Sequence, residues 1–177
     1  MGTLSCSYDT CANACTLITP RENSQAHVTG LDLNGSKLLR LPLVQAKETF
    51  LAGFWEWVSL LSSGQYEHAV ESLLWRGTPL EPSQLEERLA TFWGNAADLF
   101  TPVIPNDRLV QVINHDARVE WRNAEGWGLA QIPVTNEPAR CKEDDVPLVG
   151  IATSFFIRRH QSGENAAYVL EFEIFHA

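Results

Sequence analysis

The first residues that could do chemistry are four cysteines, three of which lie close together near the N-terminus. Cys6, Cys11 and Cys15 follow a C-x4-C-x3-C spacing, and Cys141 stands apart. This spacing lacks the paired C-x2-C of structural zinc sites and differs from that of iron–sulfur proteins. We interpret the cysteines as reduced thiols. A metal site and a disulfide formed after export are the alternatives that the spacing leaves open.

The other motifs of common chemistries are missing from the sequence. Its five histidines show neither H-x-x-x-H nor H-E-x-x-H spacing, so they predict no metal site. The sequence contains no G-x-S-x-G elbow, no P-loop and no dinucleotide fingerprint. We therefore predict no catalytic residue, no metal and no cofactor.

Composition restricts the partners that the protein can take. The 177 residues carry 13 Lys and Arg against 22 Asp and Glu, a net charge of −9. This acidity argues against non-specific binding to nucleic acids or to anionic membranes, since both require an excess of Lys and Arg. No apolar run is long enough for a transmembrane helix, and the first residues do not resemble a secretory signal. We expect a cytoplasmic protein.

The N-terminal region divides into a polar arm and a predicted hairpin. Residues 1–25 contain the cysteine cluster and almost no apolar periodicity, which predicts a flexible arm. The remainder, 26–177, is predicted to form a single α+β domain. Within it, Asn34 and Gly35 separate two alternating runs and predict a β-hairpin at 26–44.

Helical periodicity dominates residues 46–100, where we expect three helices. The first helix is expected at 46–62 and the second at 65–75, while Ser83 and Glu86 form an S-x-x-E capping box for the third. The apolar stripe of the first helix consists of Phe50, Phe54, Trp57, Val58 and Leu61. That of the third consists of Leu85, Leu89, Phe92, Ala96 and Leu99.

The pattern changes to β alternation in residues 107–177. Strands are expected at 108–114, 117–122, 127–135, 148–160 and 166–176. Helices followed by hairpin-linked strands predict an α+β fold, with three N-terminal helices packed on a curved antiparallel sheet.

The alternation of side chains also predicts which face of the sheet is buried. Matching the apolar faces of the last two strands places Ile157 opposite Leu170. The outer face then mixes aromatic residues with charges, which favours an interface. The predicted interface residues are Trp127, Leu129, Phe156, Arg158, Arg122, Glu171, Glu173 and Phe175. Trp127 and Arg122 would lie within reach of a cation–π contact.

The same alternation directs few polar groups toward the helices. No Asp or Glu of the last four strands points inward, which weakens the case for an enzyme that uses a buried carboxylate. The candidates to line a helix–sheet pocket are Tyr168, Thr153, His176, Asn114 and Trp121.

Two segments carry a resemblance to a known superfamily. FLAGFWEWVSLLSSGQYEHAVESLLW at 50–75 and YVLEFEIF at 168–175 resemble the helices and the last strand of NTF2-like proteins, over about residues 46–177. The resemblance implies a cone-shaped fold with a pocket between helices and sheet, and a sheet face often used for dimers. The superfamily includes enzymes, small-ligand binders, adaptors and toxin-immunity proteins, so the fold does not choose among them.

We expect a non-catalytic binding protein of this architecture, of an adaptor or toxin-immunity type. Its outer sheet face would bind a second copy, giving a homodimer, or another protein. The alternative is a small-ligand binder or isomerase-like enzyme that holds a small apolar ligand in the helix–sheet pocket.

Overall fold

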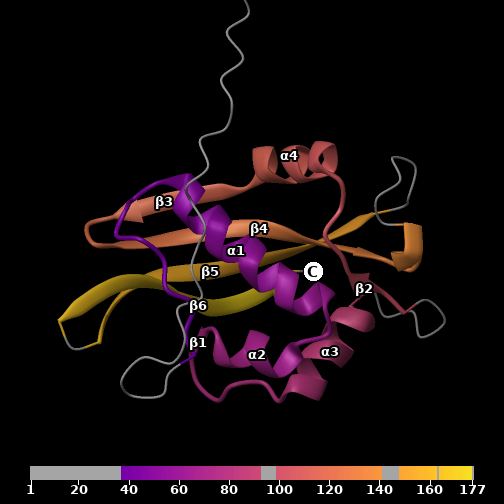
Figure 1. Ribbon diagram of the computed structural model, residues 1–177, viewed down its shortest axis with the longest axis horizontal. Coiled ribbons are helices and arrows are strands. Elements are labelled where there is room, and N and C mark those ends of the chain that lie inside the picture. Colours follow the sequence, from indigo (N-terminus) through magenta and orange to yellow (C-terminus); the bar gives the residue numbers. More distant parts are fainter. Residues whose placement is uncertain (1–36, 93–98, 141–147, 163, 177) are drawn as a thin grey trace, which may run out of the picture.

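A computed structural model describes residues 37–92, 99–140, 148–162 and 164–176 of the chain. In this part of the chain the fold is α+β, with a curled mixed sheet that carries α1, α2 and α3 on one face (Figure 1). The strand order is β1-β6-β5-β4-β2, and β3 also pairs with β4. The strands are β1 (Leu74–Trp75), β2 (Thr101–Pro102), β3 (Arg118–Arg122), β4 (Glu125–Thr135), β5 (Val149–Ser162) and β6 (Asn165–His176). The helices are α1 (Lys47–Ser62), α2 (Tyr66–Glu71), α3 (Pro82–Ala90), α4 (Asp107–Asp116) and the short 3-10 helix η1 (Pro138–Arg140).

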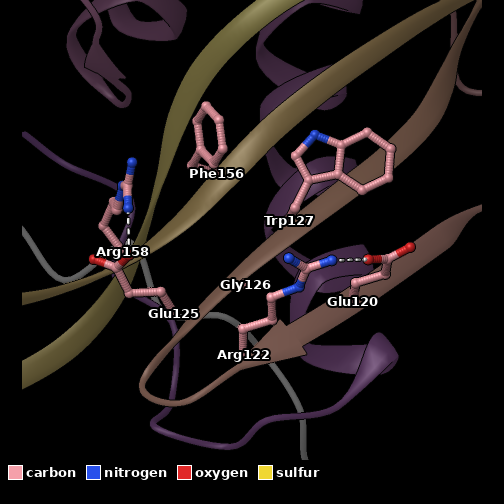
Figure 2. A pocket seen from close by; sticks show the side chains of 7 residues that line it. All are labelled: Glu120, Arg122, Glu125, Gly126, Trp127, Phe156 and Arg158. Carbon is pink, nitrogen blue, oxygen red and sulfur yellow. Dashed lines mark hydrogen bonds and ion pairs between the residues drawn. The ribbon is translucent and has the colours of Figure 1, made fainter.

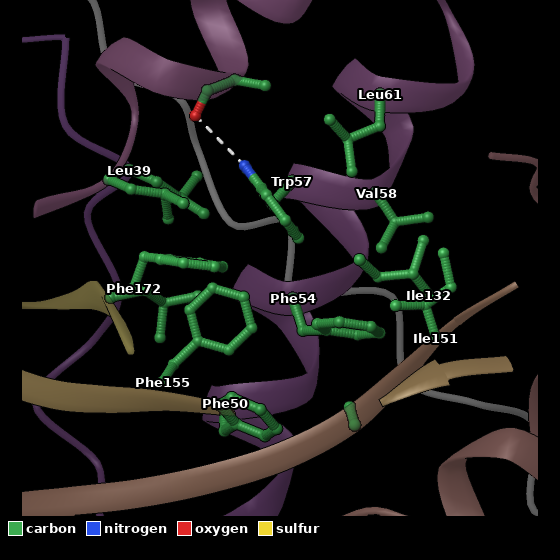
Figure 3. Packing of buried hydrophobic residues seen from close by; sticks show 14 of the residues in the cluster. Leu39, Phe50, Phe54, Trp57, Val58, Leu61, Ile132, Ile151, Phe155 and Phe172 are labelled. Atoms are coloured by element: carbon green, nitrogen blue, oxygen red, sulfur yellow. Dashed lines mark hydrogen bonds between the residues drawn. The ribbon is translucent and has the colours of Figure 1, made fainter. Parts of the chain in front are cut away.

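Helix α1 crosses the sheet and supplies the centre of the core (Figures 1 and 3). The predicted stripe is confirmed, since all five of its residues are buried. Phe50 and Phe54 lie with ring centroids 6.2 Å from that of Phe155 on β5, and the Trp57 ring meets it edge-on at 5.3 Å. Such edge-to-face contacts add to the free energy of apolar burial. The helix ends before Gly64, whose φ of +72° is readily adopted only by glycine.

The second helix is shorter than its periodicity predicts. α2 ends at Glu71, and Leu74–Trp75 forms β1, which runs parallel to β6. The sheet is therefore mixed, and the prediction of a wholly antiparallel sheet was wrong. Packing outweighs helical periodicity here because the Trp75 ring lies 4.9 Å from that of Phe172, while its Nε1 donates to the carbonyl of Val70 at 2.8 Å.

The third helix begins two residues earlier than the predicted capping box places it, and it also ends early. Glu81 is the N-cap of α3, and its backbone N–H donates to Oε1 of Gln84 at 3.1 Å in a capping box. Pro82 occupies N1, where a missing N–H costs nothing. The box predicted at Ser83 was therefore wrong. Leu85 and Leu89 are buried as expected, but the helix ends at Ala90 and Leu99 is 61% exposed.

The strand expected at 108–114 was also wrong, because this segment is helix α4. Asn106 caps the helix, its Oδ1 accepting from the Leu109 N–H at 3.0 Å. Val110 and Val112 alternate like strand residues, but Leu109, Val110 and Ile113 have helical spacing and are half-buried in α4. A hydrogen bond from Trp55 Nε1 to Asn114 Oδ1 at 2.5 Å connects α4 to α1.

The other predicted strands are confirmed as β3, β4, β5 and β6, and so is the register that places Ile157 opposite Leu170. The register shifts at one place. Ser154 pairs with Ile174 and Phe155 with Phe172, so Glu173 is the extra residue of a β-bulge. A bulge reverses the alternation of every residue beyond it.

Residues 37–46 lead into α1 along the edge of β6. Leu41 forms an isolated antiparallel bridge with Tyr168, and Leu39 and Leu41 are buried in the core. No strand forms at 37–44 beyond this bridge, which contradicts the second arm of the predicted hairpin. Its first arm, the arm at 1–25 and all four cysteines lie outside the described residues. Among the helices described, none is long and apolar enough to cross a membrane.

Candidate functional site

A groove on the outer face of the sheet, opposite α1–α3, is the candidate site (Figure 2). Its volume is about 480 Å³. Strand register builds it, because pairing brings Glu120, Trp127, Phe156 and Glu171 into one row across β3, β4, β5 and β6. The residues that line it are Glu120, Arg122, Glu125, Gly126, Trp127, Phe156 and Arg158.

Two half-buried aromatic side chains lie in this groove next to two ion pairs (Figure 2). Trp127 and Phe156 are direct neighbours on β4 and β5. On one side Arg122 contacts Glu120 at 3.5 Å, and on the other Arg158 contacts Glu125. The groove therefore offers an apolar centre with both signs of charge on its borders.

Arg158 is the most firmly held charge of the groove. Its Nε donates to Glu171 Oε2 at 2.9 Å, and its Nη1 donates to Glu125. The hydrogen bond and charge of Glu171, with a smaller contribution from Glu125, raise the pKa of the Arg158 guanidinium above its ordinary value. The guanidinium also lies 4.7 Å from the Phe156 ring centroid, which is within cation–π range. This side chain is a fixed cation with a defined orientation.

Glu173 connects the groove to the end of the sheet through a chain of hydrogen bonds. Its Oε2 accepts from Trp127 Nε1 at 2.7 Å and from Ser154 Oγ at 2.8 Å, and Nε2 of His176 lies 2.8 Å from the same Ser154 oxygen. Because the hydroxyl proton is directed to Glu173, the His176 N–H donates to Ser154. The expected cation–π contact of Trp127 with Arg122 is not found, and the indole binds Glu173 instead.

These groups do not form a nucleophilic centre. In a Ser–His–Asp triad the carboxylate orients the histidine and the histidine accepts the serine proton. Here the carboxylate accepts the serine proton directly, and Ser154 is fully buried, so a substrate cannot reach its oxygen. The network orients Trp127 and braces the bulge.

The structure corrects part of the predicted interface. Phe175 lies on the inner face, where its ring packs 4.9 Å from that of Phe172, because the bulge reverses the alternation after Glu173. Ile174 takes the outer position and is 51% exposed. Leu129 is half-buried beside the groove and does not line it. The other predicted interface residues lie in the groove or contact the residues that line it.

The predicted pocket residues do not converge. Tyr168 and Trp121 pack together at 5.1 Å between ring centroids, and Gln45 donates to Tyr168 Oη at 3.2 Å. Thr153 is buried, and its hydroxyl donates to the carbonyl of Ile151. Asn114 lies on α4 rather than on a strand, and the bulge moves His176 to the outer face. The expectation that these five residues line one pocket was therefore wrong.

Two groups near the groove were missed by the sequence analysis. Arg76, in the loop after β1, places its guanidinium 5.4 Å from the Phe156 ring centroid, and no local pattern indicates this long-range contact. Glu125 could have been predicted as a residue of this face, since alternation places it on the same side of the sheet as Trp127, next to Arg158.

The inner side of the sheet lacks the groups of acid–base or metal chemistry in the part of the chain described. Among the described residues the buried polar side chains are Thr49, Ser72, Thr135, Thr153 and Ser154, so no Asp, Glu, His, Lys or Arg is buried on either face. Nor do the described residues contain a group of three His, Cys, Asp or Glu that could hold a metal. The one buried side-chain polar atom without a partner among them is Nε1 of Trp121.

Comparisons of the chain with protein-family models, with curated proteins and with solved structures gave no significant match. The class is therefore defined by the structure alone: an α+β protein with a curled mixed sheet, and with a mixed aromatic and charged groove on the face away from its helices.

Proposed function

We propose that this is a non-catalytic binding protein of NTF2-like architecture, and that its outer sheet groove binds a polypeptide segment of another protein. The observation that carries the proposal is the pair Trp127 and Phe156, which lie side by side and half-exposed next to two ion pairs. An adaptor or a toxin-immunity protein would use such a surface.

The groove has the composition of a protein-binding surface. Aromatic residues and arginine are enriched among the residues that contribute most to binding free energy, and a charged border around an apolar centre is typical of interfaces. Trp127 and Phe156 are held in place by Glu173 and Arg158. Little side-chain entropy is therefore lost when a partner binds.

The alternative, a ligand-binding or isomerase-like enzyme, has less support. That chemistry needs a carboxylate inside an apolar pocket. The space between α1 and the sheet is instead filled by aromatic rings, with Phe50, Phe54, Trp57 and Phe155 all fully buried (Figure 3). The NTF2-like assignment is supported by helices that precede the sheet, by the long β5–β6 hairpin and by the curl of the sheet.

Site-specific photocrosslinking tests the proposal. A photoreactive phenylalanine analogue at position 156 should crosslink to another polypeptide in cells and add its mass on a denaturing gel. The same analogue at the exposed position Arg159 serves as the control, since alternation directs it to the opposite face. Trp127→Gln, which removes the aromatic ring but keeps an N–H donor beside Glu173, should abolish the crosslink without lowering the melting temperature by more than a few degrees. Equal crosslinking from both positions, or none from position 156, would overturn the proposal.

A further inference from the structure

Strand β3 has one free edge. It pairs with β4 on one side, and no other strand of the described residues pairs with it on the other. Its alternate backbone N–H and C=O groups along that edge can therefore accept another strand. Arg118, Glu120 and Arg122 lie exposed on the outer face of the strand, whereas Val119 and Trp121 are half-buried on the inner face.

We propose that β3 pairs antiparallel with β3 of a second copy of this chain, in the register centred on Trp121. Glu120 of each copy then lies directly opposite Arg122 of the other, and the two Trp121 side chains are neighbours on the inner face. In this register the three strand residues Glu120, Trp121 and Arg122 face their counterparts in the other copy, while Val119 faces Asn123 of the β3–β4 turn. Opposite charges directly across an antiparallel pair stabilise the pairing.

Charge excludes the symmetric register centred on Glu120, and helix α4 excludes the one centred on Val119. Centring on Glu120 would place Glu120 against Glu120 and Arg118 against Arg122, which is repulsive at every outer-face pair. Centring on Val119 would extend the pairing into the end of α4, which terminates at Asp116 just before β3. A helical terminus cannot continue a strand ladder. The Trp121 register displaces the second copy away from α4.

The two charges that decide the register are free to change partners. The side chains of Arg122 and Glu120 are 88% and 63% exposed, and their contact of 3.5 Å within one chain is a surface ion pair of little value to stability. Both residues also line the outer groove. Pairing would therefore place the two grooves side by side. The strand pairing is argued from β3 alone, but its use in binding a partner rests on the proposed function of the groove.

Charge reversal with light scattering tests the pairing. Glu120→Arg and Arg122→Glu each convert the two cross-chain attractions of the symmetric pair into repulsions, which should weaken dimerisation by about tenfold or more. The double variant E120R/R122E restores both attractions and should dimerise like the wild type. Arg118→Glu is the matched control, since Arg118 lies opposite the β3–β4 turn in this register and its reversal should leave the dimer intact.

Mixing the two single variants separates contacts between chains from those within one chain. The E120R chain and the R122E chain complement each other across the edge, although the ion pair within each remains broken. A dimer that forms only in the mixture supports the proposal. A monomeric wild type at high concentration overturns it, as does a dimer weakened by Arg118→Glu but not by Arg122→Glu. Crosslinking from position 156 that survives in a monomer would leave the proposed function standing while this inference fails.

Discussion

Gly128 on β4 lies directly against Phe50 of α1, and a methyl group there should be costly. A Cβ built on Gly128 would lie 2.6 Å from Cε2 of Phe50 and 2.7 Å from two more atoms of that ring. The ring cannot withdraw, because it is fully buried and lies 6.0 Å from Phe54 and 6.2 Å from Phe155, measured between ring centroids. Gly128→Ala should therefore force α1 and the sheet apart.

The magnitude follows from two opposing effects. Overpacking a filled core costs about 1–3 kcal/mol, whereas replacing glycine restricts the unfolded chain and returns about 0.4–1 kcal/mol. The net loss in free energy of unfolding is about 1–2 kcal/mol, or roughly 2–8 °C in melting temperature for a chain of this length. Because Gly128 separates Trp127 from Leu129, the shift of β4 should also weaken partner crosslinking from position 156.

Gly150→Ala is the matched control, since Gly150 also lies in a strand. The atom that its new Cβ would meet first is Oε1 of Gln131, at the far end of an exposed and flexible side chain. Its effect should stay within about 0.5 kcal/mol. Urea unfolding followed by circular dichroism measures both variants. The reasoning is refuted if Gly128→Ala is as stable as the wild type, or if Gly150→Ala is the more damaging change.

Three further outcomes are expected. Glu81→Ala should lower the free energy of unfolding in urea by about 0.5–1 kcal/mol, because it removes the cap of α3. Ser83→Ala should change it by less than about 0.5 kcal/mol. A larger loss for Ser83→Ala than for Glu81→Ala would contradict the observed cap. Burial raises the pKa of Tyr66 above 10.0, so its contribution to stability is present below pH 10 and declines as the pH rises toward the raised value. Tyr66→Phe should flatten that alkaline decline in melting temperature, and an unchanged slope would contradict the assignment. Ser154→Ala leaves the half-buried Glu173 with one donor fewer and should cost about 1–3 kcal/mol in urea unfolding; a neutral result would mean that water replaces the hydroxyl.

Local patterns were sufficient where one face of an element meets the core. The spacing of Phe50, Phe54 and Trp57 predicted α1, and matching apolar faces predicted the pairing of Ile157 with Leu170. In both cases one face of the helix or strand is buried, so its apolar residues recur at the helical or strand spacing. This spacing is visible in the sequence even when the segment that packs against it is unknown. The same alternation placed Trp127 and Phe156 together on the outer face, which is the centre of the candidate site.

Local patterns failed where two periods compete or where another segment decides the conformation. Helix α4 has no fully buried residue, and the alternation of Val110 and Val112 predicted a strand, although Leu109, Val110 and Ile113 have helical spacing and Asn106 caps the helix. Leu74 and Trp75 continue a helical pattern, yet they form β1 because β6 offers a strand edge and Phe172 a ring to pack against.

The outer groove shows both contributions at one place. The sequence alone determined that Trp127, Phe156 and Arg158 share a face, because side chains alternate along each strand. Only the tertiary structure decided that Glu173 bulges from β6, that Phe175 turns inward to Phe172, and that Arg76 reaches Phe156. The bulge depends on the fit of β6 against β5 and the core, and the Arg76 contact depends on the loop after a two-residue strand. Neither is encoded in the residues nearby, because both arise from contacts between segments far apart in the chain.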